Sequence, residues 1–145
     1  MDATRTEMLR SAGLLILRVG IGGYMMTHGW GKVQMVLAGE FDKFPADPIG
    51  VGPNASLVLA ALAEFVCAGL VVIGLGTRFA AAPVVFTMAV AAFVVHGSDP
   101  LLASGGRSKE PALIFMIVFL SLIFTGAGRL SLDALICGRQ KRPTA

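Results

Sequence analysis

Residues 56–75 read SLVLAALAEFVCAGLVVIGL, an apolar run in which Glu64 is the only charged side chain. A helix rises about 1.5 Å per residue, so a helix of this length spans the roughly 30 Å hydrocarbon core of a lipid bilayer. A run this long with a single charge is typical of a segment that crosses a membrane. The stretch therefore predicts a transmembrane α-helix.

Three more apolar blocks lie before and after this run, at about residues 11–33, 79–96 and 111–125. In the whole chain of 145 residues, 55% are hydrophobic and 14% are charged, whereas an average soluble domain has roughly 25% charged residues. This composition excludes an ordinary water-soluble protein. We expect an all-α fold with one domain over residues 1–145, a four-helix transmembrane bundle followed by a short tail at 129–145.

Four spans place both termini on one side of the membrane, and the basic residues indicate which side. Seven lysines and arginines outside the apolar centres fall on the side of the termini, and four fall on the other side. Because an excess of basic residues marks the cytoplasmic side, both termini are predicted to be cytoplasmic. The formal net charge of +3 is too small to favour nucleic acid as a partner.

Several ionisable side chains lie within the predicted spans or at their ends, where a simple anchor would carry none. Such a group costs about 2.5–3.5 kcal/mol on insertion scales, so it normally faces the bundle interior and has a partner. On the outer side of the membrane centre, by roughly 3, 9, 13 and 13 Å, lie Glu64, His28, His96 and Glu110. Arg18 lies roughly 6 Å to the inner side, and we expect it to pair with Glu64.

The first predicted helix also carries a polar stripe, because Tyr24, His28 and Lys32 recur every four positions and share one face. Histidine titrates near neutral pH, and a carboxyl group can hold or release a proton, so both suit proton transfer to a redox substrate. We therefore expect His28 and Glu64 to transfer protons in the outer half of the bundle. The residues expected to bind the substrate are Arg18, Lys32, His96 and Glu110.

Each of these residues also has a structural interpretation. His96 and Glu110 lie at span ends that water and headgroups reach, and Lys32 can extend its charge to the interface along an apolar stem. Arg18 and Glu64 suit a purely structural ion pair equally well. Two His and two Glu are also a donor set for a metal in a helical bundle, but the Glu-x-x-His spacing of di-iron proteins is missing. We assign no metal ligands.

A succession of short blocks along nearly the whole chain resembles the DoxX family. The blocks are Leu17-Arg18 with Gly22, His28-Gly29-Trp30-Gly31-Lys32, Asp47-Pro48-Ile49-Gly50-Val51-Gly52, Ala63-Glu64-Phe65, Gly74-Leu75-Gly76-Thr77-Arg78, His96 with Asp99-Pro100, Lys109-Glu110, and Gly126-Ala127-Gly128-Arg129-Leu130-Ser131-Leu132-Asp133. The resemblance implies a four-helix, multi-pass protein of the bacterial inner membrane. Members of this family are associated with quinone-linked oxidation of sulfur compounds and with membrane oxidoreductase complexes that handle thiol and oxidative stress.

Two functions are therefore expected. The first is a subunit of a quinone-linked oxidoreductase that binds quinone in the outer half of the bundle, in a cavity lined by Phe65, Met25, Met26 and Phe93. Its electrons would come from a protein partner in a redox complex or from a bound quinol. The second is a non-catalytic membrane anchor or scaffold for such a partner complex. Lipid surrounds the chain in both cases, and homo-oligomers are compatible with both. A third function is a carrier for a small metabolite. A carrier would require a homo-oligomer, since four helices are few for alternating access.

Overall fold

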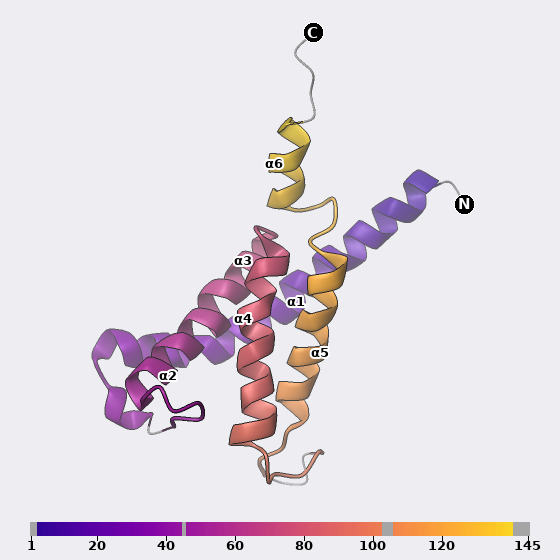
Figure 1. Cartoon of the computed structure of the whole chain (residues 1–145). Coiled ribbons are helices and arrows are strands. Elements are labelled where there is room, and N and C mark those ends of the chain that lie inside the picture. Colours follow the sequence, from indigo (N-terminus) through magenta and orange to yellow (C-terminus); the bar gives the residue numbers. More distant parts are fainter. Residues whose placement is uncertain (1–2, 45, 103–105, 141–145) are drawn as a thin grey trace.

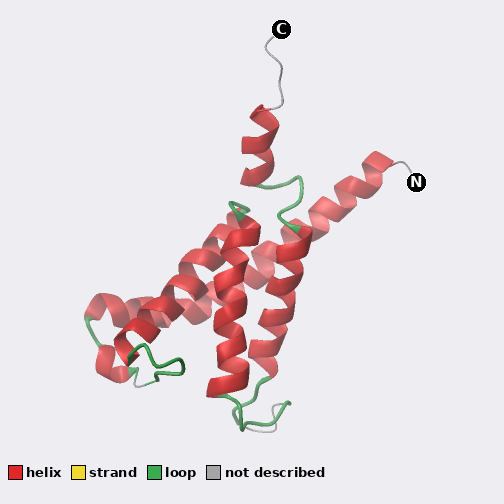
Figure 2. Ribbon diagram, in the orientation of Figure 1, coloured by secondary structure: helices red, strands yellow, loops and turns green. Residues whose placement is uncertain are grey.

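A computed structural model describes residues 3–44, 46–102 and 106–140, and the side chains of residues 4–44, 46–102 and 106–136. These residues form helices and loops with no strand (Figure 2), which confirms the all-α prediction. In chain order the elements are α1 (Ala3–Ala38), the 3-10 turn η1 (Phe41–Lys43), α2 (Pro53–Ala61), the π-helical η2 (Leu62–Cys67), α3 (Ala68–Ile73), α4 (Thr77–Val90), the π-helical η3 (Ala91–Val95), α5 (Glu110–Thr125) and α6 (Leu132–Gln140).

In the part of the chain that the structure describes, two continuous helices are long and apolar enough to cross a membrane. They are Pro53–Ile73, which runs through α2, η2 and α3, and Thr77–Val95, which runs through α4 and η3. Helix α5 is apolar but shorter. Helix α1 extends over 36 residues and continues beyond the predicted block at 11–33 at both ends.

The two long helices each contain a π-helical segment that the sequence pattern does not predict. In a π-helix a backbone N–H bonds to the carbonyl five residues earlier, which turns the following side chains relative to an α-helix. The His96 N–H bonds to the Ala91 carbonyl oxygen at 2.8 Å in this way, at the end of η3. Segment η2 contains Glu64, and η3 ends beside His96, so both irregular turns lie next to predicted site residues.

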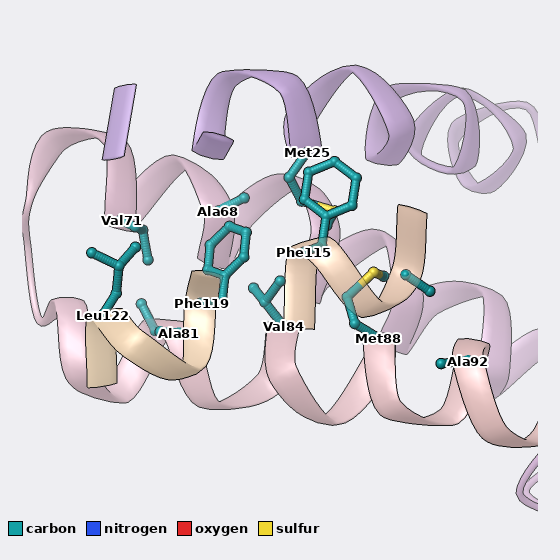
Figure 3. Packing of buried hydrophobic residues seen from close by; sticks show 12 residues of the cluster. Met25, Ala68, Val71, Ala81, Val84, Met88, Ala92, Phe115, Phe119 and Leu122 are labelled. Carbon is teal, nitrogen blue, oxygen red and sulfur yellow. The ribbon is translucent and has the colours of Figure 1, made fainter. Parts of the chain in front are cut away.

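The helices pack mainly as two pairs. Helix α1 lies along α2, η2 and α3, while α4 lies along α5, and η2 and α3 contact α4 to join the pairs (Figure 1). Large buried side chains fill the space between the pairs (Figure 3): Met25 from α1, Val71 from α3, Val84 from α4, and Phe119 and Leu122 from α5. The buried cluster extends from Val71 and Leu122 to Ala92 in η3 and Ala112 in the first turn of α5.

Two glycines let α1 approach its partner helix closely. A Cβ atom at Gly22 would lie 2.7 Å from Val72 Cγ2, and one at Gly29 would lie 2.7 Å from the Glu64 carbonyl carbon and 2.8 Å from the Phe65 nitrogen. Small residues at such contacts are a common way for helices to pack in lipid. The Gly29 contact holds α1 directly against the π-helical turn that carries Glu64.

Hydrogen bonds close the end of the molecule at the α3–α4 turn. Gly74 ends α3 with φ of +73°, a left-handed conformation that glycine adopts without steric cost. The Asp133 carboxylate accepts hydrogen bonds from the backbone N–H groups of Gly76 (2.8 Å) and Thr77 (3.2 Å), and so caps α4. The described N-terminal end of α1 and helix α6 lie toward this end, and the described parts of loops 39–52 and 96–109 lie toward the opposite end (Figure 1).

Candidate functional site

A partly buried ion pair lies where α1 meets η2. Lys32 Nζ donates a hydrogen bond to Glu64 Oε2 at 2.6 Å, and the Glu64 residue is 4% exposed. The contact at Gly29, one turn before Lys32 on α1, sets the distance between the two backbones. Charge-assisted hydrogen bonds of this length are stronger than neutral ones, so the pair fixes the position of both side chains.

The predicted partnership between Arg18 and Glu64 is wrong. Arg18 is fully buried, but its guanidinium donates to the carbonyl oxygens of Val71 (3.2 Å), Val72 (3.4 Å) and Leu130 (2.6 Å). These acceptors lie at the C-terminal end of α3 and in the segment before α6. Arg18 therefore ties α1 to the α3–α4 end of the molecule and takes no part in the Lys32–Glu64 site.

A cavity of about 570 Å³, here called cavity A, lies beside this ion pair. Its walls come from α2 and η2 on one side and from α4 and η3 on the other, and the loop contributes Phe44, Ala46, Pro48 and Ile49. Leu59, Leu62, Phe86 and Val95 line it and are also exposed, so cavity A opens sideways through the apolar flank of the molecule. Its polar lining residues are Lys32, Ser56, Glu64, Thr87 and His96.

The loop that closes cavity A is itself held by a carboxylate. Asp47 Oδ1 accepts hydrogen bonds from the Val51 N–H (2.9 Å) and the Ser56 hydroxyl (3.1 Å), and Oδ2 accepts one from the Gly52 N–H (3.0 Å). These bonds join the loop to the first turn of α2. The Asp47 carboxylate thus positions the neighbouring Pro48 and Ile49 in the cavity wall.

A second cavity of about 420 Å³, cavity B, lies on the other side of the ion pair. Helix α1 contributes Met25 and His28, and α5 contributes Ala112 and Phe115. Residues 106–108, including the exposed Arg107, form the mouth at the loop end of the molecule. The residues that line both cavities are Lys32, Glu64, Ala91 and His96.

The two histidines have different surroundings. The exposed ring of His28 packs edge-on against Tyr24 and Phe115, with ring centroids 5.1 and 5.6 Å apart, and faces cavity B. His96 Nδ1 lies 2.7 Å from Asp99 Oδ2. A hydrogen bond from Nδ1 to a carboxylate leaves Nε2 as the ring nitrogen available to a bound molecule.

The structure therefore brings four of the six predicted site residues together: His28, Lys32, Glu64 and His96. Arg18 lies at the other end of the core, and Glu110 lines neither cavity. Of the four side chains expected to line the cavity, Met25 lines cavity B, whereas Met26, Phe65 and Phe93 line neither cavity. Sequence reasoning missed Arg107 and Asp99, although Asp99 stands three residues after His96, a spacing that allows the observed contact.

The described residues contain no group of three or more His, Cys, Asp or Glu side chains that could hold a metal ion. Glu64 already has a cationic partner in Lys32, and His96 already has an anionic one in Asp99. The arrangement is suited to holding protons and binding a polar head group beside an apolar cavity.

Comparisons with known proteins identify a family and two relatives to which this chain is similar. Residues 13–97, which include the ion pair and most of the cavity walls, match the model of the DoxX family. A Haemophilus influenzae protein described as uncharacterized is 34% identical over 133 residues, covering 88% of this chain and 92% of that protein. A second one from the same organism, described in the same words, is 32% identical and covers 85% of this chain and 82% of its own length. No solved structure matches. The two long apolar helices and the family match make this a membrane protein, and the chain belongs to the DoxX family.

Proposed function

We propose that the protein is a multi-pass subunit of a quinone-linked redox system in the bacterial inner membrane, and that it binds quinone in cavity A. The single observation that carries this proposal is the Lys32–Glu64 pair, with its buried carboxylate, in the wall of an apolar cavity. A quinone has a polar head that exchanges protons and an apolar tail that needs lipid or an apolar channel. Cavity A offers both environments in one space.

The dimensions of cavity A favour such a ligand. Binding sites for small molecules usually measure about 300–1,000 Å³ and combine apolar walls with few polar groups. Cavity A, at about 570 Å³, lies in this range and opens between α2 and α4. Because exposed apolar side chains surround the opening, a lipophilic molecule can enter from the membrane without crossing water.

The polar residues have distinct proposed roles. Interconversion of quinone and quinol moves two electrons and two protons; the electrons pass to or from a redox-active protein partner. Glu64 gains or releases a proton next to the head group, and Lys32 stabilises the carboxylate form of Glu64 through the 2.6 Å hydrogen bond. His96, which lines both cavities, donates a hydrogen bond to the head group or accepts one from it.

The membrane topology belongs to the same proposal. The first predicted span corresponds to α1, the second to the continuous helix from α2 to α3, the third to α4 with η3, and the fourth to α5. Both termini are cytoplasmic. This orientation is supported by the seven basic residues on the side of the termini against four on the other. The described parts of loops 39–52 and 96–109, and with them cavity B, then lie at the outer face.

Filling cavity A with a side chain tests the proposal. Ala60 lines cavity A, so Ala60→Phe is expected to lower the quinone that co-purifies in mild detergent from near-stoichiometric to about one-tenth or less of the wild-type amount. The matched control is Ala55→Phe, which places the same ring at an exposed position of α2 that lines neither cavity. Extraction and chromatography of the bound quinone measure both variants.

Two results would contradict the proposal. The wild-type protein could carry no quinone and take up none from quinone-containing lipid, or Ala60→Phe could retain as much quinone as Ala55→Phe. If a redox partner still co-purified with Ala60→Phe in either case, the chain would act as an anchor or scaffold for that partner.

A further inference from the structure

The Lys32–Glu64 pair is the polar part of a wall between two cavities of different character. On one side, cavity A is bounded by apolar side chains of α2 and α4 and opens sideways. On the other side, cavity B contains the exposed His28 and Arg107 and opens at the loop end. Glu64 therefore contacts both an apolar space and a polar one.

The opposite direction along the bundle is closed by packed side chains. Between the ion pair and the α3–α4 turn lie Ala68, Val71, Phe119 and Leu122, each fully buried. The interior of a packed protein has few voids that hold a water molecule, and an apolar void stays dry. Among the described residues, this apolar packing separates Glu64 from the end of the molecule that holds Arg18.

From these observations we propose that cavity B is the water-side access route to Glu64. Proton exchange at the quinone site takes place with the compartment that faces loop 96–109, and the compartment at the α3–α4 end is excluded. The role of this route in quinone chemistry rests on the proposed function, whereas the existence of the route depends only on the two cavities. The charged or titratable residues that line the route are His28 and Lys32 from α1, Glu64 from η2, His96 after η3, and Arg107 from the loop.

The route has a consequence for the direction of proton movement. Each quinone that is reduced takes two electrons from the redox-active protein partner and two protons through cavity B. Each quinol that is oxidised passes two electrons to that partner and releases two protons through cavity B. Turnover therefore changes the proton concentration on the loop side, whichever direction the reaction takes.

Cysteine labelling tests the route without any redox assay. In a background with Cys67→Ala and Cys137→Ala, single cysteines are placed at Ala91, which lines both cavities, and at Ala112, which lines cavity B. The controls are Ala89→Cys and Ile114→Cys, two residues away on the same helices and outside both cavities. Ser98→Cys and Leu135→Cys, both exposed, report the two ends of the molecule.

The probe is a membrane-impermeant, positively charged methanethiosulfonate added to one side of sealed vesicles that contain the protein. We expect Ala91→Cys and Ala112→Cys to react from the side on which Ser98→Cys reacts, at least about tenfold faster than their controls. Reaction from the side of Leu135→Cys, or equal rates for Ala91→Cys and Ala89→Cys, would overturn the proposal. If this labelling pattern is found but no quinone binds, the access route stands and the quinone function fails.

Discussion

Glu64→Gln is expected to lower the rate of quinone-dependent electron transfer by about 100-fold or more while the protein still inserts into the membrane. Glutamine keeps the size of the side chain and an oxygen that accepts a hydrogen bond from Lys32, but it cannot gain or release a proton. Loss of a positioned acid or base typically lowers a rate by about 10²–10⁴. The absorbance change of a short-chain quinone in membranes that contain the redox partner measures this rate.

A second variant separates proton transfer from structural damage. Glu64→Gln leaves the partly exposed Lys32 ammonium without its counter-charge, which destabilises the folded protein. The double variant Lys32→Met with Glu64→Gln removes both charges and that penalty. If Glu64 transfers protons, the double variant stays inactive although its stability returns; recovered activity would show that the pair is only structural. Glu64→Asp, which retains a carboxyl group, should keep part of the activity.

Gly29→Ala is expected to destabilise the protein by about 1–3 kcal/mol and to lower its quinone content. The added methyl group would lie 2.7–2.9 Å from backbone and Cβ atoms of Glu64 and Phe65, which have little freedom to move. Helix α1 must then shift away from η2, and the 2.6 Å contact between Lys32 and Glu64 lengthens. Thermal unfolding in mild detergent, together with quinone extraction, measures both effects.

Gly31→Ala is the matched control for this substitution. Gly31 lies on the same helix, two residues further along, and a Cβ atom there would meet nothing within 4 Å. Alanine also has a better helix propensity than glycine. Gly31→Ala should therefore unfold at or slightly above the wild-type temperature, and an equal loss of stability in both variants would contradict the role assigned to Gly29.

The helical fold could be predicted from the sequence because its signal is local. Apolar runs bounded by turn residues indicated the helices, and the predicted blocks 79–96 and 111–125 fall within a few residues of the observed Thr77–Val95 and Glu110–Thr125. The predicted block at 11–33 is shorter than α1. Polar residues toward both ends of this helix end the apolar run, but they are compatible with helical structure. The π-helical turns were not predictable, because one additional residue in a single turn barely changes the spacing of apolar residues along the helix.

The candidate site could be predicted in part. The cost of placing a charge in lipid identified Glu64, His28 and His96, the polar stripe on the first helix identified Lys32, and the structure brings these residues together. The partner of Glu64 was assigned to the wrong cation because sequence spacing gives heights along a helix but not the direction that each helix faces. The estimated heights place Arg18 and Glu64 on opposite sides of the membrane centre. The carbonyl acceptors of Arg18 come from residues 53, 54 and 112 positions away, which no local pattern encodes.

Photolabelling with an azido-quinone tests the central claim most directly, namely that quinone binds in cavity A beside the Lys32–Glu64 pair. We expect cross-links in the peptides that contain residues 59–63 and 83–90, which excess unlabelled quinone prevents and which Ala60→Phe abolishes. Cross-links spread over the lipid-facing surfaces of α1 and α5, unchanged by Ala60→Phe, would contradict it.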